Sequence, residues 1–257
     1  MYQQSLYSGK FPDVWKHSVI IPLYKGRGER SSPASYRPIS LCSCIGKILE
    51  KLVHNQLTCY LTQSNSISKA QHGFVPGRST VTNLLSCDAA IADILSANHA
   101  YDIVTFDFKA AFDKAPHRHV IQALAQNGIK GSILSWYASF LTGRTEQVKV
   151  GDSYSAVCEV VSGVIQGSVS GPDLYSLLVD TLLRTISLPR WCFADDIKFL
   201  ADVTLHSRAT VQADIDVVSA WSDEMHMPLS LEKCGIIHGG YHQPNNAYVI
   251  HGITLLA

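Results

Sequence analysis

The stretch Trp191-Cys-Phe-Ala-Asp-Asp-Ile-Lys-Phe-Leu200 places two adjacent carboxylates, Asp195 and Asp196, between two segments rich in aromatic and β-branched residues. Such segments favour strands, whereas Asp is depleted in strands and neighbouring Asp side chains repel each other. The pattern therefore predicts a hairpin whose strands, 191–193 and 197–200, are joined by an acidic turn. Two interpretations remain open at this point: an ordinary polar turn, or carboxylates held in place to bind a cation.

A third carboxylate, Asp107, ends the run Tyr101-Asp-Ile-Val-Thr-Phe-Asp107, which has the composition of a buried strand. If this strand and the hairpin are neighbours in one sheet, the three carboxylates converge at one sheet edge. Their repulsion in a cleft would cost on the order of several kcal/mol unless cations neutralise it. Mg²⁺ suits such a site, because it takes one or two carboxylates together with substrate phosphates. A pair of such ions stabilises the attacking and leaving oxygens in nucleotidyl transfer.

The remaining sequence alternates between helical and extended patterns. Apolar residues recur at helical spacing between Ile45 and Leu57, which predicts an amphipathic helix over 45–61. Further helices are predicted over 80–96, 119–127, 136–141 and 214–221, and one follows a loop within 167–183. Strands are predicted at 19–25, 147–150, 156–161, 235–238 and 248–250, with an extended segment at 36–40. This alternation indicates an α+β or α/β fold.

The composition indicates a globular chain. Hydrophobic residues make up 46% of the 257 residues and charged residues 16%. No apolar run reaches the roughly 18 residues that a membrane helix needs, and the first residues lack a secretory signal pattern, so we expect an intracellular protein without a membrane segment. The seven Cys are scattered, which favours reduced, mostly buried thiols over a metal site.

Charge is unevenly distributed although the net charge is zero. Residues 1–60 contain 8 Lys and Arg against 3 Asp and Glu, whereas residues 151–257 contain 5 against 12. The asymmetry suggests a basic region for phosphates and an acidic region for cations. Chance variation over a solvated surface is the alternative interpretation.

Several segments resemble the motifs of one protein family, in that family's order and spacing. Asp107-Phe-Lys-Ala-Ala-Phe-Asp113, Ser162-Gly-Val-Ile-Gln-Gly-Ser-Val-Ser-Gly-Pro172 and Phe193-Ala-Asp-Asp196 resemble the three catalytic motifs of reverse transcriptases. Segments 36–41, 47–51 and 71–80 resemble finger motifs of the non-LTR (LINE-type) retrotransposon polymerases. Trp221 and 229–233 resemble the motif that follows the catalytic hairpin. The resemblance covers about residues 11–255.

The resemblance implies an α+β right-hand polymerase, with an antiparallel palm sheet packed on helices. Residues 1–100 would form a fingers-like region, residues 101–257 would form the palm, and the thumb would be absent or truncated. The implied function is that of an RNA-directed DNA polymerase domain of a non-LTR retrotransposon. Its partners would be an RNA template, a DNA primer and deoxynucleoside triphosphates. Without an upstream endonuclease or a Cys/His knuckle, we expect a fragment or decaying copy of a longer element.

Specific roles follow from the resemblance for individual residues. Asp107, Asp195 and Asp196 would be catalytic and would hold two Mg²⁺ ions, with the Phe108 carbonyl as a further ligand and Mn²⁺ as an alternative metal. A second set would bind the nucleotide: Lys25, Arg37, Phe112, Gln166, Gly167 and Lys233. Of these, Phe112 would pack under the sugar and Lys233 would be the general acid for pyrophosphate. Arg78 would contact the template phosphate.

Several of these residues also fit ordinary structural positions, and the second motif departs from the family pattern at some positions. Phe112 also fits a core position, and each of the basic residues also fits a solvated surface. The second motif departs from the family pattern at Ile165, where Pro is usual, and at 169–172, where Val-Ser-Gly-Pro replaces Val-Leu-Ser-Pro. The alternative functions are a catalytically silent remnant that only binds nucleic acid, and a metal-dependent phosphohydrolase. The latter leaves the finger motifs unexplained.

Overall fold

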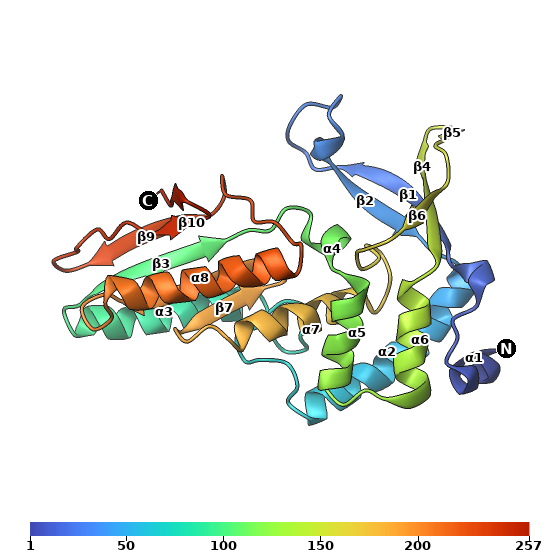
Figure 1. The fold of residues 1–257 in the computed structure, drawn as a ribbon, viewed down its shortest axis with the longest axis horizontal. Coiled ribbons are helices and arrows are strands. Elements are labelled where there is room, and N and C mark those ends of the chain that lie inside the picture. The colour runs from blue at the N-terminus through green and yellow to red at the C-terminus, as the bar shows by residue number, and fades with distance from the viewer. Residues whose placement is uncertain (257) are drawn as a thin grey trace. The chain divides into compact units, whose positions relative to one another are not determined.

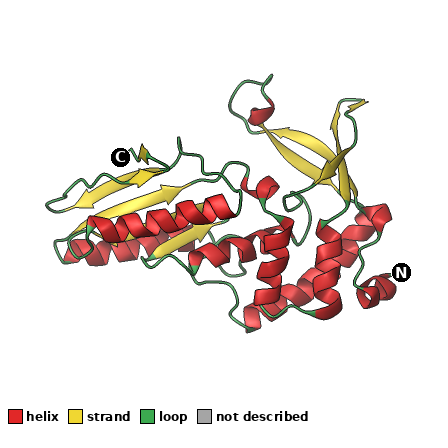
Figure 2. Ribbon diagram, viewed as in Figure 1, coloured by secondary structure: helices red, strands yellow, loops and turns green. Residues whose placement is uncertain are grey.

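The computed structural model describes residues 1–256 as a mixed α+β fold, which confirms the predicted class (Figures 1 and 2). The chain forms two compact units. The first contains residues 1–66 and 112–175, and the second contains residues 67–111 and those from Ser176 onward. Two helices, α4 (Ala111–Lys114) and α7 (Gly171–Leu183), cross the divisions. The fingers-like and palm regions, predicted to divide at about residue 100, remain a prediction.

The first unit combines a small sheet with helices. Its sheet has the order β2-β1-β4-β5, and β6 pairs with β4. The pairing of β1 with β4 is parallel and the other pairings are antiparallel. The strands are β1 (His17–Tyr24), β2 (Tyr36–Leu41), β4 (Arg144–Val150), β5 (Ser153–Tyr154) and β6 (Cys158–Val160). The helices are α1 (Tyr2–Ser8), α2 (Cys44–Gln63), α5 (His117–Gln126) and α6 (Gly131–Leu141), with short 3₁₀ helices at Asp13–Trp15 and Pro33–Ser35.

Helix α2 confirms the predicted helix but buries only part of its apolar stripe. Ser43 caps its first turn by accepting a hydrogen bond from the Gly46 backbone N–H. Leu49, Val53 and Leu57 are buried, whereas three other members of the stripe, Ile45, Ile48 and Leu52, are exposed. The stripe is wider than the surface the helix packs against, so periodicity alone overstated the burial.

The second unit is built on an antiparallel sheet of order β7-β8-β3-β9. The strands are β7 (Arg190–Phe193), β8 (Asp196–Asp202), β3 (Ala100–Phe106) and β9 (Gly235–Gly240). A two-stranded ribbon pairs β10 (Val249–Ile250) with β11 (Ile253–Thr254). The helices are α3 (Thr80–Ser96), α8 (Arg208–Glu224) and most of α7. The structure therefore confirms the predicted strand ending at Asp107 and the predicted hairpin at 191–200.

The strands of this sheet carry apolar residues on both faces. Ile103, Trp191 and Leu200 form a cluster with Cys87 of α3. Phe106 and Phe199, whose rings are 5.5 Å apart, alternate with those residues and so point to the other face, over which Figure 1 shows α8. A sheet buried on both faces has little freedom, so the residues at its ends are held in fixed positions.

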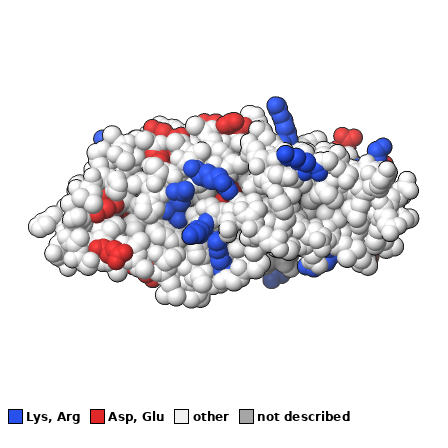
Figure 3. Space-filling model, turned by 90° about the horizontal axis from the view of Figure 1, so that it is seen from below, with Lys and Arg blue, Asp and Glu red and all other residues white. Residues whose placement is uncertain are grey.

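The face shown in Figure 3 carries charges of both signs, with uncharged areas between them. Among the residues that the structure describes, no helix combines the length and hydropathy needed to cross a bilayer. All seven Cys are free thiols, but only Cys87, Cys192 and Cys234 are buried. The prediction of mostly buried thiols was therefore wrong, because several of them lie on the outward sides of α2 and β6.

Candidate active site

Asp107 and Asp196 lie at the same end of two neighbouring strands. Strand β3 ends at Phe106, which pairs with Ile197 of the antiparallel strand β8. Asp107 follows β3 and Asp196 begins β8, so the two carboxylates meet at one sheet edge. Asp195 occupies the turn between β7 and β8, where Phe193 pairs with Asp196. The strand arrangement predicted from the sequence is therefore confirmed, whereas the roles of these carboxylates remain proposals.

The hairpin turn has an unusual backbone conformation. Ala194 has a φ of 59°, a left-handed conformation that costs a non-glycine residue about 1–2 kcal/mol. Gln71, which is fully buried, stabilises the turn. Its Oε1 accepts hydrogen bonds from the backbone N–H groups of Ala194 (3.2 Å) and Gly73 (2.7 Å), and its Nε2 donates to Cys192 Sγ.

The segment that contains Gln71 pairs directly with the hairpin. Gln71 forms a parallel bridge with Cys192, and the His72 N–H donates to the Cys192 carbonyl at 2.8 Å. At Gly73 a Cβ would lie 2.3 Å from the Ala194 nitrogen, so only glycine fits there. The sequence interpretation quoted this segment but assigned no role to Gln71. The local sequence shows only that Gln71 precedes Gly73 by two positions, and this does not reveal a partner that lies far away in the chain.

Burial and mutual repulsion both act on the hairpin carboxylates. Desolvation raises the pKa of Asp195, and repulsion from Asp196 and Asp107 adds to that rise. Desolvation followed by the charge of Asp107 raises the pKa of Asp196. The positive charge of Lys233 opposes both increases. The site therefore favours the approach of positive charge.

Lys233 supplies one such charge. Its Nζ lies 2.7 Å from Asp107 Oδ2, in an ion pair whose lysine side chain is 57% exposed. The preceding residues attach to the same strand end, because the Ser230 N–H donates to the Asp107 carbonyl at 2.7 Å. Phe108 forms an antiparallel bridge with Leu229, and its ring packs edge-on against Trp221. The motif predicted to follow the hairpin thus contacts Asp107.

The donors at this strand end suit a hard cation. Carboxylate oxygens are the preferred ligands of Mg²⁺, which commonly uses one or two of them and completes its shell with water and phosphate. Among the described residues, no three His, Cys, Asp or Glu side chains form a ready-made metal-binding group. The donor chemistry fits a divalent ion that arrives together with a substrate.

A pocket of about 450 Å³ opens beside Asp107 and Asp196. Helix α3 contributes Asn83 and Leu84 to its wall, and the strands contribute the apolar side chains of Phe106, Phe193 and Ile197. Two lysines, Lys198 and Lys233, line it as well. The carboxylates therefore border a cavity with both apolar and positively charged walls.

In the first unit, Lys25 and Arg37 lie on a shared strand pair. Arg37 of β2 pairs with Leu23 of β1, and Lys25 follows the end of β1, so both residues lie near one end of the pair. Both are exposed. The Lys25 ammonium donates to the Ala34 carbonyl at 2.8 Å, which holds it against the following loop.

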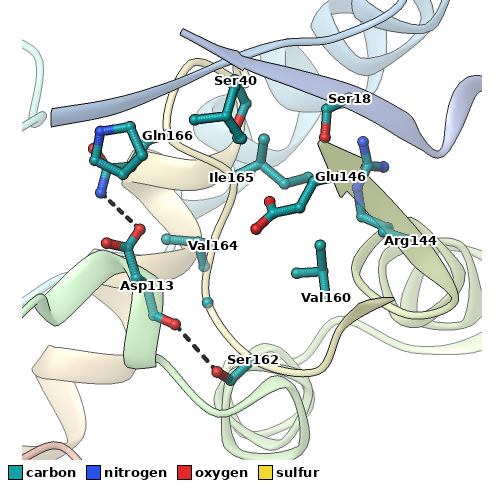
Figure 4. A pocket seen from close by; sticks show the side chains of 13 residues that line it. Ser18, Ser40, Asp113, Arg144, Glu146, Val160, Ser162, Val164, Ile165 and Gln166 are labelled. Atoms are coloured by element: carbon teal, nitrogen blue, oxygen red, sulfur yellow. Dashed lines mark hydrogen bonds between the residues drawn. The ribbon is translucent and has the colours of Figure 1, made fainter. Parts of the chain in front are cut away.

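Phe112, Gln166 and Gly167 all lie in the first unit, and Figure 4 shows the loop that carries Gln166. The Phe112 ring stacks on Tyr175 with 4.3 Å between centroids. The Gln166 carbonyl accepts a hydrogen bond from the Ser40 N–H of β2 at 2.7 Å. Gly167 has a φ of 111°, and a Cβ there would lie 2.8 Å from the Ser40 carbonyl oxygen, so this close approach requires glycine.

Glu50 of α2 supports the same loop, a role that sequence reasoning missed. Its buried carboxylate accepts hydrogen bonds from the Val169 and Ser170 N–H groups at 2.8 and 2.7 Å. Burial raises the pKa of Glu50, and these hydrogen bonds oppose that rise. At Gly171 a Cβ would lie 2.9 Å from the Ile165 carbonyl. The departure from the family pattern at Gly171 is therefore compatible with the start of α7 at that residue.

Arg78 holds the segment that precedes the hairpin contact. Its Nη1 donates to the carbonyls of Ser68 (2.8 Å) and Gln71. The guanidinium thus stabilises the loop that presents Gln71, a structural role that the sequence did not predict. The predicted contact of Arg78 with a template phosphate stays a prediction.

The comparisons with known proteins agree with this architecture. Residues 24–252 match the family described as "Reverse transcriptase (RNA-dependent DNA polymerase)". This chain belongs to the reverse transcriptase family. The resemblance inferred from the motifs is therefore confirmed, and the family as a whole uses divalent metal ions and binds nucleic acids.

Relatives of this reverse transcriptase domain come from mobile elements. It is 30% identical over 233 residues to a probable RNA-directed DNA polymerase from transposon BS of Drosophila melanogaster, covering 87% of this chain and 26% of that protein. It is 28% identical over 279 residues to the RNA-directed DNA polymerase from mobile element jockey of the same fly, covering 96% of this chain and 30% of the relative. The chain thus spans about a quarter to a third of the relatives it matches.

Solved structures share the fold of this reverse transcriptase domain. An apo telomerase from Candida tropicalis, truncated from its C-terminal domain, aligns with a TM-score of 0.67 at 14% identity, over 94% of this chain and 53% of that one. Telomerase from the same organism in complex with a fragment of telomeric RNA aligns with a TM-score of 0.65 at 12% identity, over 93% of this chain and 43% of that one. At this identity the likeness shows the fold alone.

Proposed function

We propose that this chain is an RNA-directed DNA polymerase domain of a non-LTR retrotransposon. It adds deoxynucleotides to a primer 3′-OH and releases pyrophosphate. The observation that supports this most is the meeting of Asp107, Asp195 and Asp196 at one end of β3 and the β7–β8 hairpin. The family match places these residues within a polymerase domain.

In this proposal the three carboxylates hold two Mg²⁺ ions, for which Mn²⁺ can substitute, and the Phe108 carbonyl is a further ligand. The ions supply electrostatic stabilisation of the attacking and leaving oxygens. The carboxylates keep their positions because the sheet and Gln71 fix the backbone that carries them. Lys233 neutralises Asp107 at 2.7 Å before substrate arrives and then donates a proton to the departing pyrophosphate.

The residues of the first unit bind the nucleotide. Lys25 and Arg37 contact the triphosphate, because a polyanion requires basic groups opposite the metal ions. Phe112 packs under the sugar and disfavours a 2′-OH. Gln166 and Gly167 line the nucleotide site, and Arg78 contacts the template.

The finer architecture and the partners belong to the same proposal. Residues 1–100 act as fingers and residues 101–257 as the palm. The partners are an RNA template, a DNA primer and deoxynucleoside triphosphates, which are available inside the cell. The unit with the four-stranded antiparallel sheet carries the catalytic carboxylates.

Primer extension tests this function. The unmodified chain should extend oligo(dT) on poly(rA) with dTTP in the presence of Mg²⁺ and stop when the metal is chelated. An Asp195→Asn variant should lose extension by at least about a hundredfold. An Asp152→Asn variant, which changes an exposed turn, should retain it. Equal extension by the Asp195→Asn and unmodified chains would refute the assigned mechanism.

The alternative function is a silent remnant that binds nucleic acid. Filter binding on the same preparation separates the two functions. Salt-sensitive binding without incorporation, in the unmodified chain, would favour the remnant. Release of free phosphate from a nucleotide would instead indicate a phosphohydrolase.

A further inference from the structure

Asp113 makes a direct side-chain contact with Gln166. Its Oδ1 accepts a hydrogen bond from Gln166 Nε2 at 2.7 Å, and both residues line a pocket of about 300 Å³ (Figure 4). Asp113 lies on α4, directly after Phe112. The sequence interpretation quoted Asp113 within a motif but gave it no role.

The backbone between these two residues is already fixed. The Val164 N–H donates to the Phe112 carbonyl at 2.8 Å, and the Ser162 hydroxyl donates to the Asp113 carbonyl at 3.1 Å. The Gln166 carbonyl accepts from the Ser40 N–H. The loop therefore keeps its path without the Asp113 carboxylate, which is free to serve another purpose.

That purpose follows from the chemistry of the two groups. An ionised carboxylate only accepts hydrogen bonds, whereas a glutamine amide has a donor end and an acceptor end. Asp113 therefore turns the NH₂ of Gln166 toward itself and leaves Oε1 as an acceptor on the opposite side. Desolvation raises the pKa of Asp113, and the hydrogen bond from Gln166 and the positive charge of Lys25 oppose part of that rise.

We propose that Asp113 is a positioning residue that fixes the amide of Gln166 for nucleotide binding. The inference rests on the proposed function, because it concerns how the nucleotide site of that function is built. Two further members of the proposed nucleotide site are related to Asp113. Phe112 directly precedes it in the chain, and the positive charge of Lys25 acts on its carboxylate. A fixed amide binds a ligand without first losing rotational freedom.

Equilibrium binding of dTTP tests the inference without turnover. The chain is loaded with poly(rA) and a dideoxy-terminated oligo(dT) primer, and the Kd for dTTP is measured. Asp113→Ala and Gln166→Ala should each raise the Kd about tenfold, the size expected from loss of a charge-assisted hydrogen bond. The double variant should be no weaker than the weaker single variant, because both changes remove one interaction. Asp113→Asn keeps an acceptor and should restore part of the affinity.

Glu159→Gln is the matched control. Glu159 is an exposed residue of β6 outside this pocket, so its variant should bind dTTP like the unmodified chain. Thermal melting should be the same for Asp113→Ala and the control, which separates positioning from loss of folding.

The outcomes separate this inference from the proposed function. An unchanged Kd in Asp113→Ala would overturn the inference, and so would a double variant in which the two increases in Kd multiply. If the unmodified chain still extends a primer normally, the proposed function is unaffected by either result. The expected Kd values in a chain that cannot extend an unblocked primer would contradict the function alone. A chain that binds no dTTP at all would contradict both.

Discussion

Two sets of carboxylates in this molecule serve opposite purposes: those that hold the 162–170 loop and those of the β7–β8 hairpin. In the first unit, Glu50 accepts two backbone hydrogen bonds and Asp113 accepts one from Gln166. In the second unit, Asp195 and Asp196 accept no side-chain hydrogen bond from another residue within the described part of the chain, and repulsion from Asp107 adds to the rise in pKa that desolvation causes in both. The contrast shows that the chain does not lack donors. Hydrogen bonds hold the carboxylates that contact the first-unit loop, whereas at the strand end Lys233 pairs with Asp107.

The two regions also differ in how their backbones are held. The 162–170 loop is fixed by individual hydrogen bonds to neighbouring elements, including one from Ser40. The hairpin is fixed by a strand ladder, by Gln71 and by the close approach of Gly73 to Ala194. Because Asp195 and Asp196 repel each other, the hairpin that carries them requires a more rigid backbone than the 162–170 loop. Substitutions at the hairpin support, at Glu50 and at Lys233 test this difference.

Gly73→Ala should have the largest effect on stability. The added Cβ would lie 2.3 Å from the Ala194 nitrogen, and the backbone N–H groups of Gly73 and Ala194 are both held by Gln71. Urea denaturation should show a loss of about 3 kcal/mol. Gly77→Ala is the control: its Cβ meets nothing within 4 Å, so only its φ of 77° is strained and the loss should be about 1 kcal/mol. Equal losses in the two variants would show that the close approach is unimportant.

Gln71→Ala should come next, with a loss of about 2 kcal/mol. The change leaves the buried N–H groups of Ala194 and Gly73 without their acceptor. Primer extension should fall further than stability alone explains, because the turn that carries Asp195 loses its support. The same change at Gln63, at the exposed end of α2, should have little effect on either measurement. Full activity in Gln71→Ala would contradict the support assigned to this residue.

Glu50→Gln should make stability less dependent on pH. Burial raises the pKa of Glu50 in the folded chain above the unfolded value of about 4.3. Its ionisation therefore destabilises the fold as pH rises from that value toward neutrality. The variant keeps an acceptor and carries no charge, so it should gain stability relative to the unmodified chain between about pH 4 and 7. A stability difference between the two chains that stays constant across this range would contradict the assigned cause.

Lys233→Met should have the smallest effect on stability. The ion pair with Asp107 is exposed on the lysine side, so its loss should cost less than about 1 kcal/mol and should cost less still at high salt. Lys69→Met, at an exposed position, provides the reference. A loss of several kcal/mol, unaffected by salt, would mean that Lys233 is a structural element of the strand end.

Local patterns in the sequence were sufficient to predict the strands and the strand end at Asp107. Alternating aromatic and β-branched residues identified β3, β7 and β8, and the acidic residues at their ends indicated one shared edge. Motif resemblance supplied the family. These signals lie within short segments, where propensity and periodicity act directly.

The supporting residues could not be predicted in the same way. Gln71 contacts Ala194, 123 positions away in the chain, and Glu50 contacts Ser170, 120 positions away. A polar residue in a helix or loop carries no local sign of such a partner. For the same reason periodicity could not decide which half of the α2 stripe would be buried.

Mn²⁺ uptake is the direct test of whether Asp107, Asp195 and Asp196 form a metal centre. Electron paramagnetic resonance can count the ions bound by the chain in the presence of poly(rA), a dideoxy-terminated primer and dTTP. The account predicts about two Mn²⁺ per unmodified chain. It also predicts loss of at least one ion in Asp107→Asn but not in Asp152→Asn. Undiminished uptake by the Asp107→Asn variant would contradict the assignment of this strand end as the metal centre.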